Sequence, residues 1–192
     1  DGRLSESHGG RQAQQRIDRG RFCSMVAAVA TVVIAAAAAA AARAAAPSSY
    51  PHAETLDAGG DVRMRWAVTG DTLHVEATFA VAGTWVALGF SPNGGMPGAD
   101  IVVAWRDANG TAVFTDRHAP TYGAPLVDAQ QSATLDALDE VDGATVLRFS
   151  RALASCDEHD MDVAGTMRVI YAYGTAPVAA GGDIAKHADA RR

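Results

Sequence analysis

The apolar run WVALGF at residues 85–90 is the stretch that most constrains the fold. Its apolar residues are continuous rather than alternating, which is typical of a short strand covered on both faces. A second run of the same kind, ADIVVAW at residues 99–105, follows the turn-forming segment SPNGGMPG at residues 91–98. The three segments together predict two buried strands joined by a glycine-rich loop.

The sequence on either side also has the features of strands. Residues 62–68 and 73–79 alternate between apolar and polar side chains, and a Gly-Asp turn lies between them, so they predict a hairpin with one solvated face. Further strands are expected at residues 111–114, 144–149 and 166–173, and a crossing loop at residues 121–132. Because no segment after Pro47 has an apolar stripe of helix length, we predict an all-β protein, either a sandwich or a barrel.

The first 46 residues differ in composition from the rest. Arginines at positions 16, 19 and 21 precede an uncharged, alanine-rich run over residues 22–42, and Pro47 follows a further three alanines. A basic flank, an apolar run and an A-x-A exit are typical of an export signal cleaved after Ala46. An uncleaved membrane anchor is the alternative, since the run is nearly long enough to cross a bilayer. We therefore expect a leader over residues 1–46 and a domain over residues 47–192 that is secreted or anchored outside the cytoplasm.

The charge balance and the motifs exclude several functions. The chain has a formal net charge of −6, and residues 47–192 carry 10 basic and 19 acidic side chains. An acidic chain without a basic cluster repels phosphate, so we expect no nucleic-acid partner. The sequence has no G-x-S-x-G elbow, P-loop, dinucleotide fingerprint or H-E-x-x-H zinc helix.

Two features near residue 160 have simple interpretations. Cys156 is the only cysteine beyond the leader, so it is either buried, or it forms a disulfide with another chain or with a region of a larger protein. The acidic run DEHDMD at residues 157–162 is interpreted as a solvated turn rather than a cation site.

Met96 lies in the glycine-rich loop rather than on an apolar strand or helix. It is either a gap-filling residue folded back onto the sandwich or a soft thioether ligand.

The segment WVALGFSPNGGMPGADIVVAWR at residues 85–106 closely resembles a DOMON domain, particularly the N-terminal one of dopamine β-monooxygenase-like proteins. Other matching landmarks are DAQQ at 128–131, FSR at 149–151, SCD at 155–157, the strand from Gly165 to Gly174, and Lys186-His187 near the end. The resemblance covers about residues 52–192.

The resemblance implies an immunoglobulin-like antiparallel β-sandwich that binds haem or another ligand outside the cytoplasm. Some relatives hold haem b between a methionine and a histidine, which by position would be Met96 and His187 here. Two axial side-chain ligands leave no open iron position, so such a haem would transfer electrons. A redox protein or a small reductant such as ascorbate would then be the partner.

The resemblance leaves other functions open. It implies a cation site that includes the Asp100 carboxylate and the Ile101 carbonyl, although Ser132 stands where that site has a further acidic residue. A non-redox module would bind a carbohydrate or another small ligand through Trp85, Trp105 and Tyr122, or would dock onto a protein. A third reading is a fragment of a copper monooxygenase, but this chain lacks the histidine clusters of the catalytic domains, so we assign it no enzymatic activity.

Overall fold

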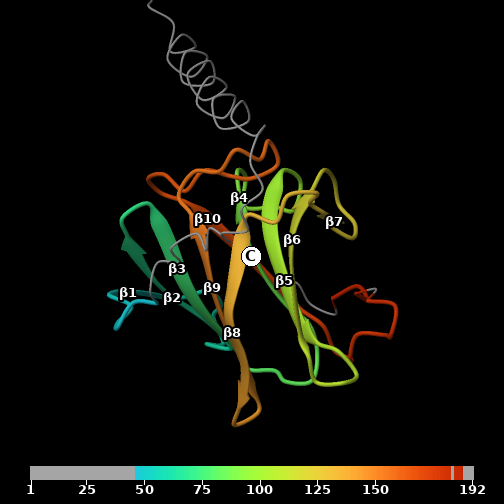
Figure 1. The fold of residues 1–192 in the computed structure, drawn as a ribbon. Coiled ribbons are helices and arrows are strands. Elements are labelled where there is room, and N and C mark those ends of the chain that lie inside the picture. Colours follow the sequence, from blue (N-terminus) through green and yellow to red (C-terminus); the bar gives the residue numbers. More distant parts are fainter. Residues whose placement is uncertain (1–45, 183, 188–192) are drawn as a thin grey trace, which may run out of the picture. The chain divides into compact units, whose positions relative to one another are not determined.

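The computed structural model describes residues 46–182 and 184–187, so the predicted leader lies outside the described residues except for Ala46. The described chain forms two five-stranded sheets, ordered β1-β2-β3-β9-β8 and β10-β4-β5-β6-β7, which face each other as a sandwich (Figure 1). Every pair of neighbouring strands is antiparallel. No helix in this described part of the chain is long and apolar enough to cross a membrane.

The strands of the first sheet are β1 (His52–Thr55), β2 (Val62–Thr69), β3 (Thr72–Phe79), β8 (Ala133–Val141) and β9 (Ala144–Ala152). The strands of the second sheet are β4 (Val86–Ser91), β5 (Ala99–Arg106), β6 (Ala112–Ala119), β7 (Leu126–Val127) and β10 (Arg168–Tyr173). The all-β fold predicted from the spacing of the strands and the sandwich implied by the resemblance are confirmed, and β2 with β3 is the predicted hairpin.

Three strands were not predicted: β1, β7, which lies within the expected crossing loop, and β8. β8 contains Leu135, Leu138 and Val141, which recur every three residues instead of every two. The structure explains this pattern, because the pairing of β8 with β9 shifts register between Leu135 and Ala137. Such a bulge adds a residue to one strand and interrupts the period of two by which strands are recognised.

The second sheet buries apolar side chains on both faces. Val86, Leu88 and Phe90 of β4 pack into the main core between the two sheets. Trp85 and Ala87 face the other way, into a second apolar cluster on the outer face of this sheet. The continuous run at residues 85–90 is therefore buried on both sides, as its lack of alternation predicts.

Candidate functional site

A cavity of about 700 Å³ lies on the outer face of the second sheet. Three strands supply apolar residues to its wall: Ala87 and Gly89 from β4, Ile101 and Val103 from β5, and Ile170 and Ala172 from β10. These residues alternate along each strand with residues of the main core, as the pleat of a sheet requires. Three segments complete the wall: residues 94–96, residues 122–125 and residues 184–187.

Gly89 is needed for this wall to close. A Cβ atom at this position would lie 2.9 Å from the Asp100 carbonyl oxygen, 2.9 Å from Ile101 Cγ1 and 3.1 Å from Ile170 Cγ1. Real Cβ atoms do not approach backbone oxygen so closely, and a well-packed sheet gives way only at a cost in stability. A residue without a side chain therefore lets β5 and β10 pack close to β4 beneath the cavity.

Hydrogen bonds fix the loop that carries Met96. The Ser91 hydroxyl donates to the Gly95 carbonyl at 2.5 Å and accepts from the Gly94 amide at 2.9 Å. The Gly98 amide donates to the Ala119 carbonyl at 2.7 Å. Gly94 and Gly98 have φ values of 76° and 77°, which favour glycine. The loop thus holds Met96 half-buried in the wall of the cavity.

His187 reaches the same cavity from the segment that follows β10. The Gly174 amide donates to the Trp85 carbonyl at 2.9 Å, which ties the start of this segment to the second sheet. Ile184 then packs against the outer apolar cluster, and residues 184–187 line the cavity. Met96 and His187 therefore line the same cavity.

The three aromatic candidates take different positions. Trp85 is 4% exposed and lines the cavity, but its Nε1 is buried beside Gly174 and has no hydrogen-bond partner among the described residues. Tyr122 also lines the cavity but is 73% exposed, so it lies at the mouth. Trp105 is buried in the outer apolar cluster and is not among the residues that line the cavity.

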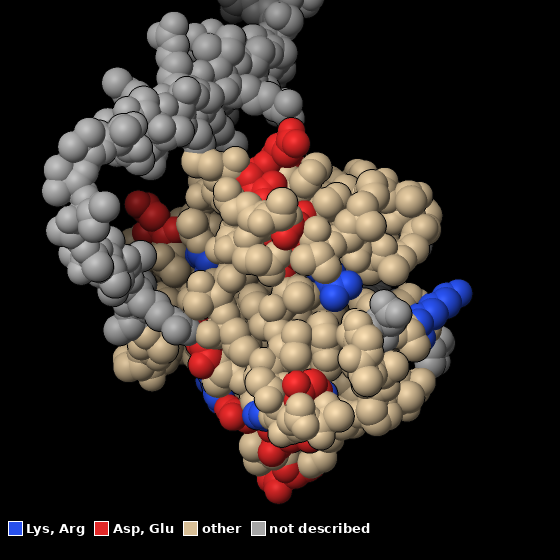
Figure 2. Space-filling view, turned by 45° about the vertical axis from the view of Figure 1, so that its right-hand side comes forward, with Lys and Arg blue, Asp and Glu red and all other residues tan. Residues whose placement is uncertain are grey.

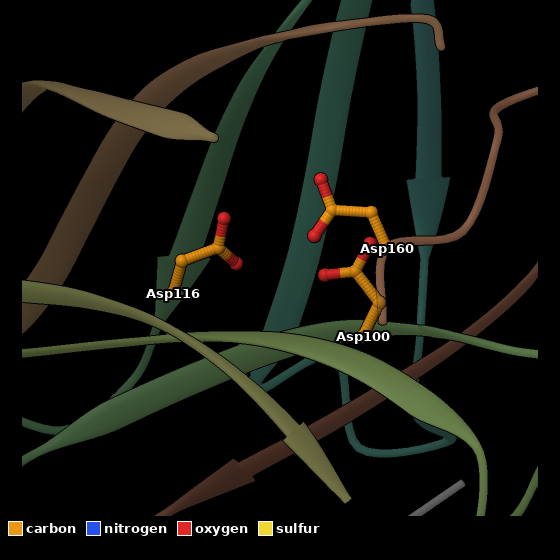
Figure 3. Close-up of side chains that lie close together, drawn as sticks. All are labelled: Asp100, Asp116 and Asp160. Carbon is orange, nitrogen blue, oxygen red and sulfur yellow. The ribbon is translucent and has the colours of Figure 1, made fainter. Parts of the chain in front are cut away.

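Asp100 belongs to a second site, between the sheets rather than on the outer face. Its carboxylate meets those of Asp116 and Asp160, and the three have ligand atoms within 4.8 Å of one another. Figure 3 shows the three carboxyl groups directed toward a common space. Arg151 Nη1 donates to Asp100 Oδ2, which also accepts from the Met161 amide at 2.9 Å.

The three carboxylates are only partly satisfied by the protein. Asp116 Oδ1 and both carboxylate oxygens of Asp160 are buried and accept no hydrogen bond from the described residues. Arg151 Nη2 lies 3.6 Å from Asp160 Oδ2, an ion-pair distance rather than a hydrogen bond. Burial, followed by the charges of Asp100 and Asp160, raises the pKa of Asp116 to about 7. Burial also raises the pKa of Asp100, despite the opposing charge of Arg151.

The solvated-turn interpretation of residues 157–162 is wrong for Asp160, whose side chain is 1% exposed. Its burial depends on β5 and β6, which lie far away in the sequence, as well as on Arg151 of β9, so the acidic run alone does not indicate it. Ile101 follows Asp100 in β5 but directs its side chain to the cavity on the opposite face. Ser132, where the resemblance implies an acidic residue, donates a hydrogen bond from its backbone amide to Asp116 Oδ2 at 3.0 Å.

Cys156 is exposed, which excludes the prediction that this cysteine is buried.

A two-sheet antiparallel sandwich with a cavity on the outer face of one sheet defines an all-β module. The family model described as DOMON domain matches residues 58–174. The chain belongs to the DOMON domain family, as the resemblance predicted.

The curated relatives include DBH-like monooxygenase protein 1 of Mus musculus, which is 38% identical over 126 residues, covering 65% of this chain and 20% of that protein. MOXD1 homolog 2 of Drosophila melanogaster is 37% identical over 122 residues, covering 62% of this chain and 16% of that protein. The chain thus spans a fifth or less of the length of these relatives.

Among solved structures, the fold is similar to the cytochrome b domain of pyranose dehydrogenase from Coprinopsis cinerea. The TM-score is 0.51 at 16% sequence identity, covering 70% of this chain and 76% of that one. At this identity the likeness shows a shared fold.

Proposed function

We propose that this domain is an electron-transfer module that binds haem b in the cavity on the second sheet, with Met96 and His187 as its axial ligands. The observation that carries the proposal is that both residues line one cavity although they are far apart along the chain. Met96 lies in the loop between β4 and β5, and His187 lies in the segment after β10. Thioether and imidazole are the donor pair found in electron-transfer cytochromes.

The cavity fits such a group in size and character. Its volume of about 700 Å³ lies within the range of small-molecule and cofactor sites. The wall formed by β4, β5 and β10 is made of glycine, alanine, valine and isoleucine apart from the aromatic residues, so it offers a flat face an aromatic macrocycle can lie against.

When bound in this way, haem b supplies a one-electron Fe(III)/Fe(II) couple with no open position for oxygen. The residues of the chain set the conditions for that couple. The Met96 thioether would favour the reduced iron and raise the reduction potential, and the apolar wall would exclude water and raise it further. The hydrogen bonds of Ser91 keep the Met96 loop in one conformation, so a change of oxidation state needs little rearrangement.

The proposal extends to location and partners. A domain exported by its leader, secreted or anchored outside the cytoplasm, would exchange electrons with a redox protein or a small reductant such as ascorbate. We propose electron transfer rather than catalysis, because the part that this chain matches is a fifth or less of those relatives.

A haem titration followed by visible absorption tests this function. We expect the purified full chain to bind one equivalent of haem and to develop a Soret band with the features of six-coordinate haem b. A chain that takes up no haem contradicts the proposal.

A non-redox ligand is the second candidate, because Trp85 and Tyr122 line the same cavity. Aromatic rings with a few polar groups are typical of small-molecule sites, sugars included. Glycan binding without haem uptake, lost in Trp85→Ala, would select this function.

We also propose that Asp100 holds a structural cation, together with Asp116 and Asp160. Buried carboxylate oxygens without hydrogen bonds are costly unless a charge compensates them, and Arg151 brings only one positive charge to three carboxylates. An all-oxygen ligand set favours Ca²⁺ or Mg²⁺ over zinc or copper. The participation of the Ile101 carbonyl stays a prediction.

A further inference from the structure

We infer that Asn109 is a modification site, to which an N-linked oligosaccharide is attached when the chain is exported. The inference goes beyond the proposed haem site and does not depend on it, but it rests on the export proposed above. Residues Asn109-Gly110-Thr111 have the form N-x-T with a residue other than proline in the middle. This is the acceptor sequence for N-linked sugars in secreted proteins.

The asparagines of the chain form a natural comparison. The sequence contains two of them, Asn93 and Asn109, and each is exposed and followed by glycine. The residue two positions after Asn93 is Gly95, so that segment lacks the hydroxyl side chain that the acceptor sequence requires. Asn109 has Thr111 at the corresponding position. The same Asn-Gly pair therefore occurs once as an acceptor and once as a non-acceptor.

Asn109 lies in the turn between β5 and β6, where an attached sugar has room. Asn109, Gly110 and Thr111 are all exposed. A Cβ atom built at Gly110 would meet no other atom of the described chain within 4 Å, so the space beside the turn is open. A glycan is bulky and hydrophilic, and it is compatible with the folded domain only at a surface loop of this kind.

Asp107 holds the backbone of this turn. Its Oδ1 accepts hydrogen bonds from the amides of Asn109 and Thr111, both at 2.9 Å. The Asp107 amide donates to the Thr111 carbonyl, and the Gly110 amide donates to the Asp107 carbonyl, also at 2.9 Å. The side chains of Asn109 and Thr111 form no hydrogen bond with the described residues. The fold thus uses the Asp107 side chain to shape the turn and leaves the Asn109 amide group available for modification.

The neighbouring surface is solvated as well. Arg106 ties the turn to β8, because its guanidinium donates to the Gly110 carbonyl at 2.6 Å and to the Leu138 carbonyl. In the hairpin formed by β8 and β9, Glu140 and Asp142 are exposed. Figure 2 shows acidic groups at the surface of this lower end of the described chain. A hydrophilic glycan fits such surroundings without covering an extended apolar surface.

The turn lies away from the Met96 loop. The Met96 loop precedes β5 and the turn follows it, so the two lie at opposite ends of the strand (Figure 1). β5 supplies Ile101 and Val103 to the cavity wall from its first half. A glycan on Asn109 would therefore leave the Met96 loop uncovered, and it would disfavour partner contacts at the other end of the sandwich.

The attachment is a group transfer from an oligosaccharide linked to a lipid diphosphate in the lumen of the secretory pathway. A bond forms between Asn109 Nδ2 and the first carbon of the sugar, and the bond from that carbon to the diphosphate oxygen breaks. The lipid diphosphate leaves, and Nδ2 loses one proton to solvent. The transferase of the secretory membranes holds the donor, and this chain supplies only the acceptor.

Expression of the full chain in animal cells tests the inference. We expect the exported wild-type chain to migrate more slowly on a gel than the same chain after treatment with N-glycosidase. Mass spectrometry of the glycopeptides should place the sugar on Asn109 and none on Asn93. Asn109→Gln and Thr111→Ala should each abolish the mobility shift, whereas Thr111→Ser, which keeps the hydroxyl group, should retain it. Made in bacteria without sugar, all three variants should melt at the wild-type temperature, because Asp107 and the backbone supply the hydrogen bonds of the turn.

Export is measured independently of the sugar, by release of the chain into the medium or by its protection from added protease inside sealed membranes. An exported chain without a sugar on Asn109 overturns the inference and leaves the proposed location standing. A mobility shift that persists in both Asn109→Gln and Thr111→Ala places the modification elsewhere and also overturns it. A chain that stays in the cytosol overturns the proposed location, and this inference fails with it.

Discussion

Met96 and His187 line one cavity, although Met96 precedes β5 and His187 follows β10. The second sheet makes this possible because β10 pairs with β4, so the chain returns beside the strand that leads into the Met96 loop. Antiparallel pairing of β4 with β5 and with β10 builds one wall, and the loops after β4 and β10 close over it. The candidate site is therefore a consequence of strand order rather than of sequence proximity.

The first prediction concerns the wall of the cavity. Gly89→Ala should lower the free energy of unfolding by about 1–3 kcal/mol, the usual cost of forcing a methyl group into packed structure. The physical reason is the 2.9 Å approach of the new Cβ to the Asp100 carbonyl oxygen. Denaturant unfolding measures the change.

Gly95→Ala is the matched control for this variant. Gly95 also lines the cavity, but the nearest atom to a Cβ there is Tyr122 Oη at 3.6 Å, an ordinary contact. Equal stability of the two variants would contradict the account of Gly89.

The second prediction concerns the redox potential of the haem-loaded chain. Met96→His replaces a thioether by an imidazole, which stabilises Fe(III) relative to a thioether. We expect the midpoint potential to fall by on the order of 100 mV while the iron remains six-coordinate. Spectroelectrochemical titration measures the potential. A potential unchanged from that of the wild-type chain would show that Met96 is not a ligand.

The third prediction concerns the pH dependence of stability. The pKa of Asp116 is about 7 in the folded chain against 3.8 as the ordinary value, so between these values the folded state holds a proton that the unfolded state releases. The stabilisation that this proton gives to the folded state is complete below the ordinary pKa of 3.8 and is lost as the pH rises toward 7. The free energy of unfolding should therefore fall with pH, by at most about 1.4 kcal/mol per pH unit from this group.

Asp116→Asn isolates this contribution, since the amide cannot lose a proton in this range. Unfolding of both proteins is measured from pH 4 to pH 8 in the presence of a chelator. We expect the stability of the variant relative to the wild type to rise with pH over this interval. A difference that does not depend on pH would rule out the raised pKa.

The fourth prediction concerns the cation. Millimolar Ca²⁺ should raise the melting temperature of the full chain, because a ligand bound only by the folded state stabilises it by mass action. Asp160→Asn should remove most of this effect. Glu158→Gln, a change in the same segment at a side chain that is 88% exposed, should leave it intact. No Ca²⁺ or Mg²⁺ response of the wild-type chain would mean that Arg151 and protons neutralise the cluster without a cation.

The fold was largely predictable because strand signals are local. Alternation identifies β2 and β3, and the continuous runs identify β4 and β5 as strands buried on both faces. β8 was not predicted because its bulge replaces the alternation of apolar residues by a spacing of three residues. A bulge is fixed by the partner strand, and that partner is not visible in the sequence of β8 alone.

The candidate site residues also differ in how far the sequence could predict them. Met96 stood out because a methionine in a glycine-rich loop has no packing period to explain it, and the resemblance supplied His187. The cluster of Asp100, Asp116 and Asp160 had no such signal for two of its members. Asp116 lies within a strand and Asp160 within an acidic run, and only the packing of β5, β6 and the segment after β9 brings them together.

The most direct test of the account is the spin state of the ferric haem in the loaded full chain, measured by electron paramagnetic resonance. We predict a low-spin, six-coordinate signal for the wild type, and conversion to high-spin iron in both Met96→Leu and His187→Gln. Met167→Leu and His52→Gln, changes of the same kind outside the cavity, should keep the low-spin signal. A low-spin signal that survives both cavity variants would contradict the account, because the iron would then take its ligands from elsewhere.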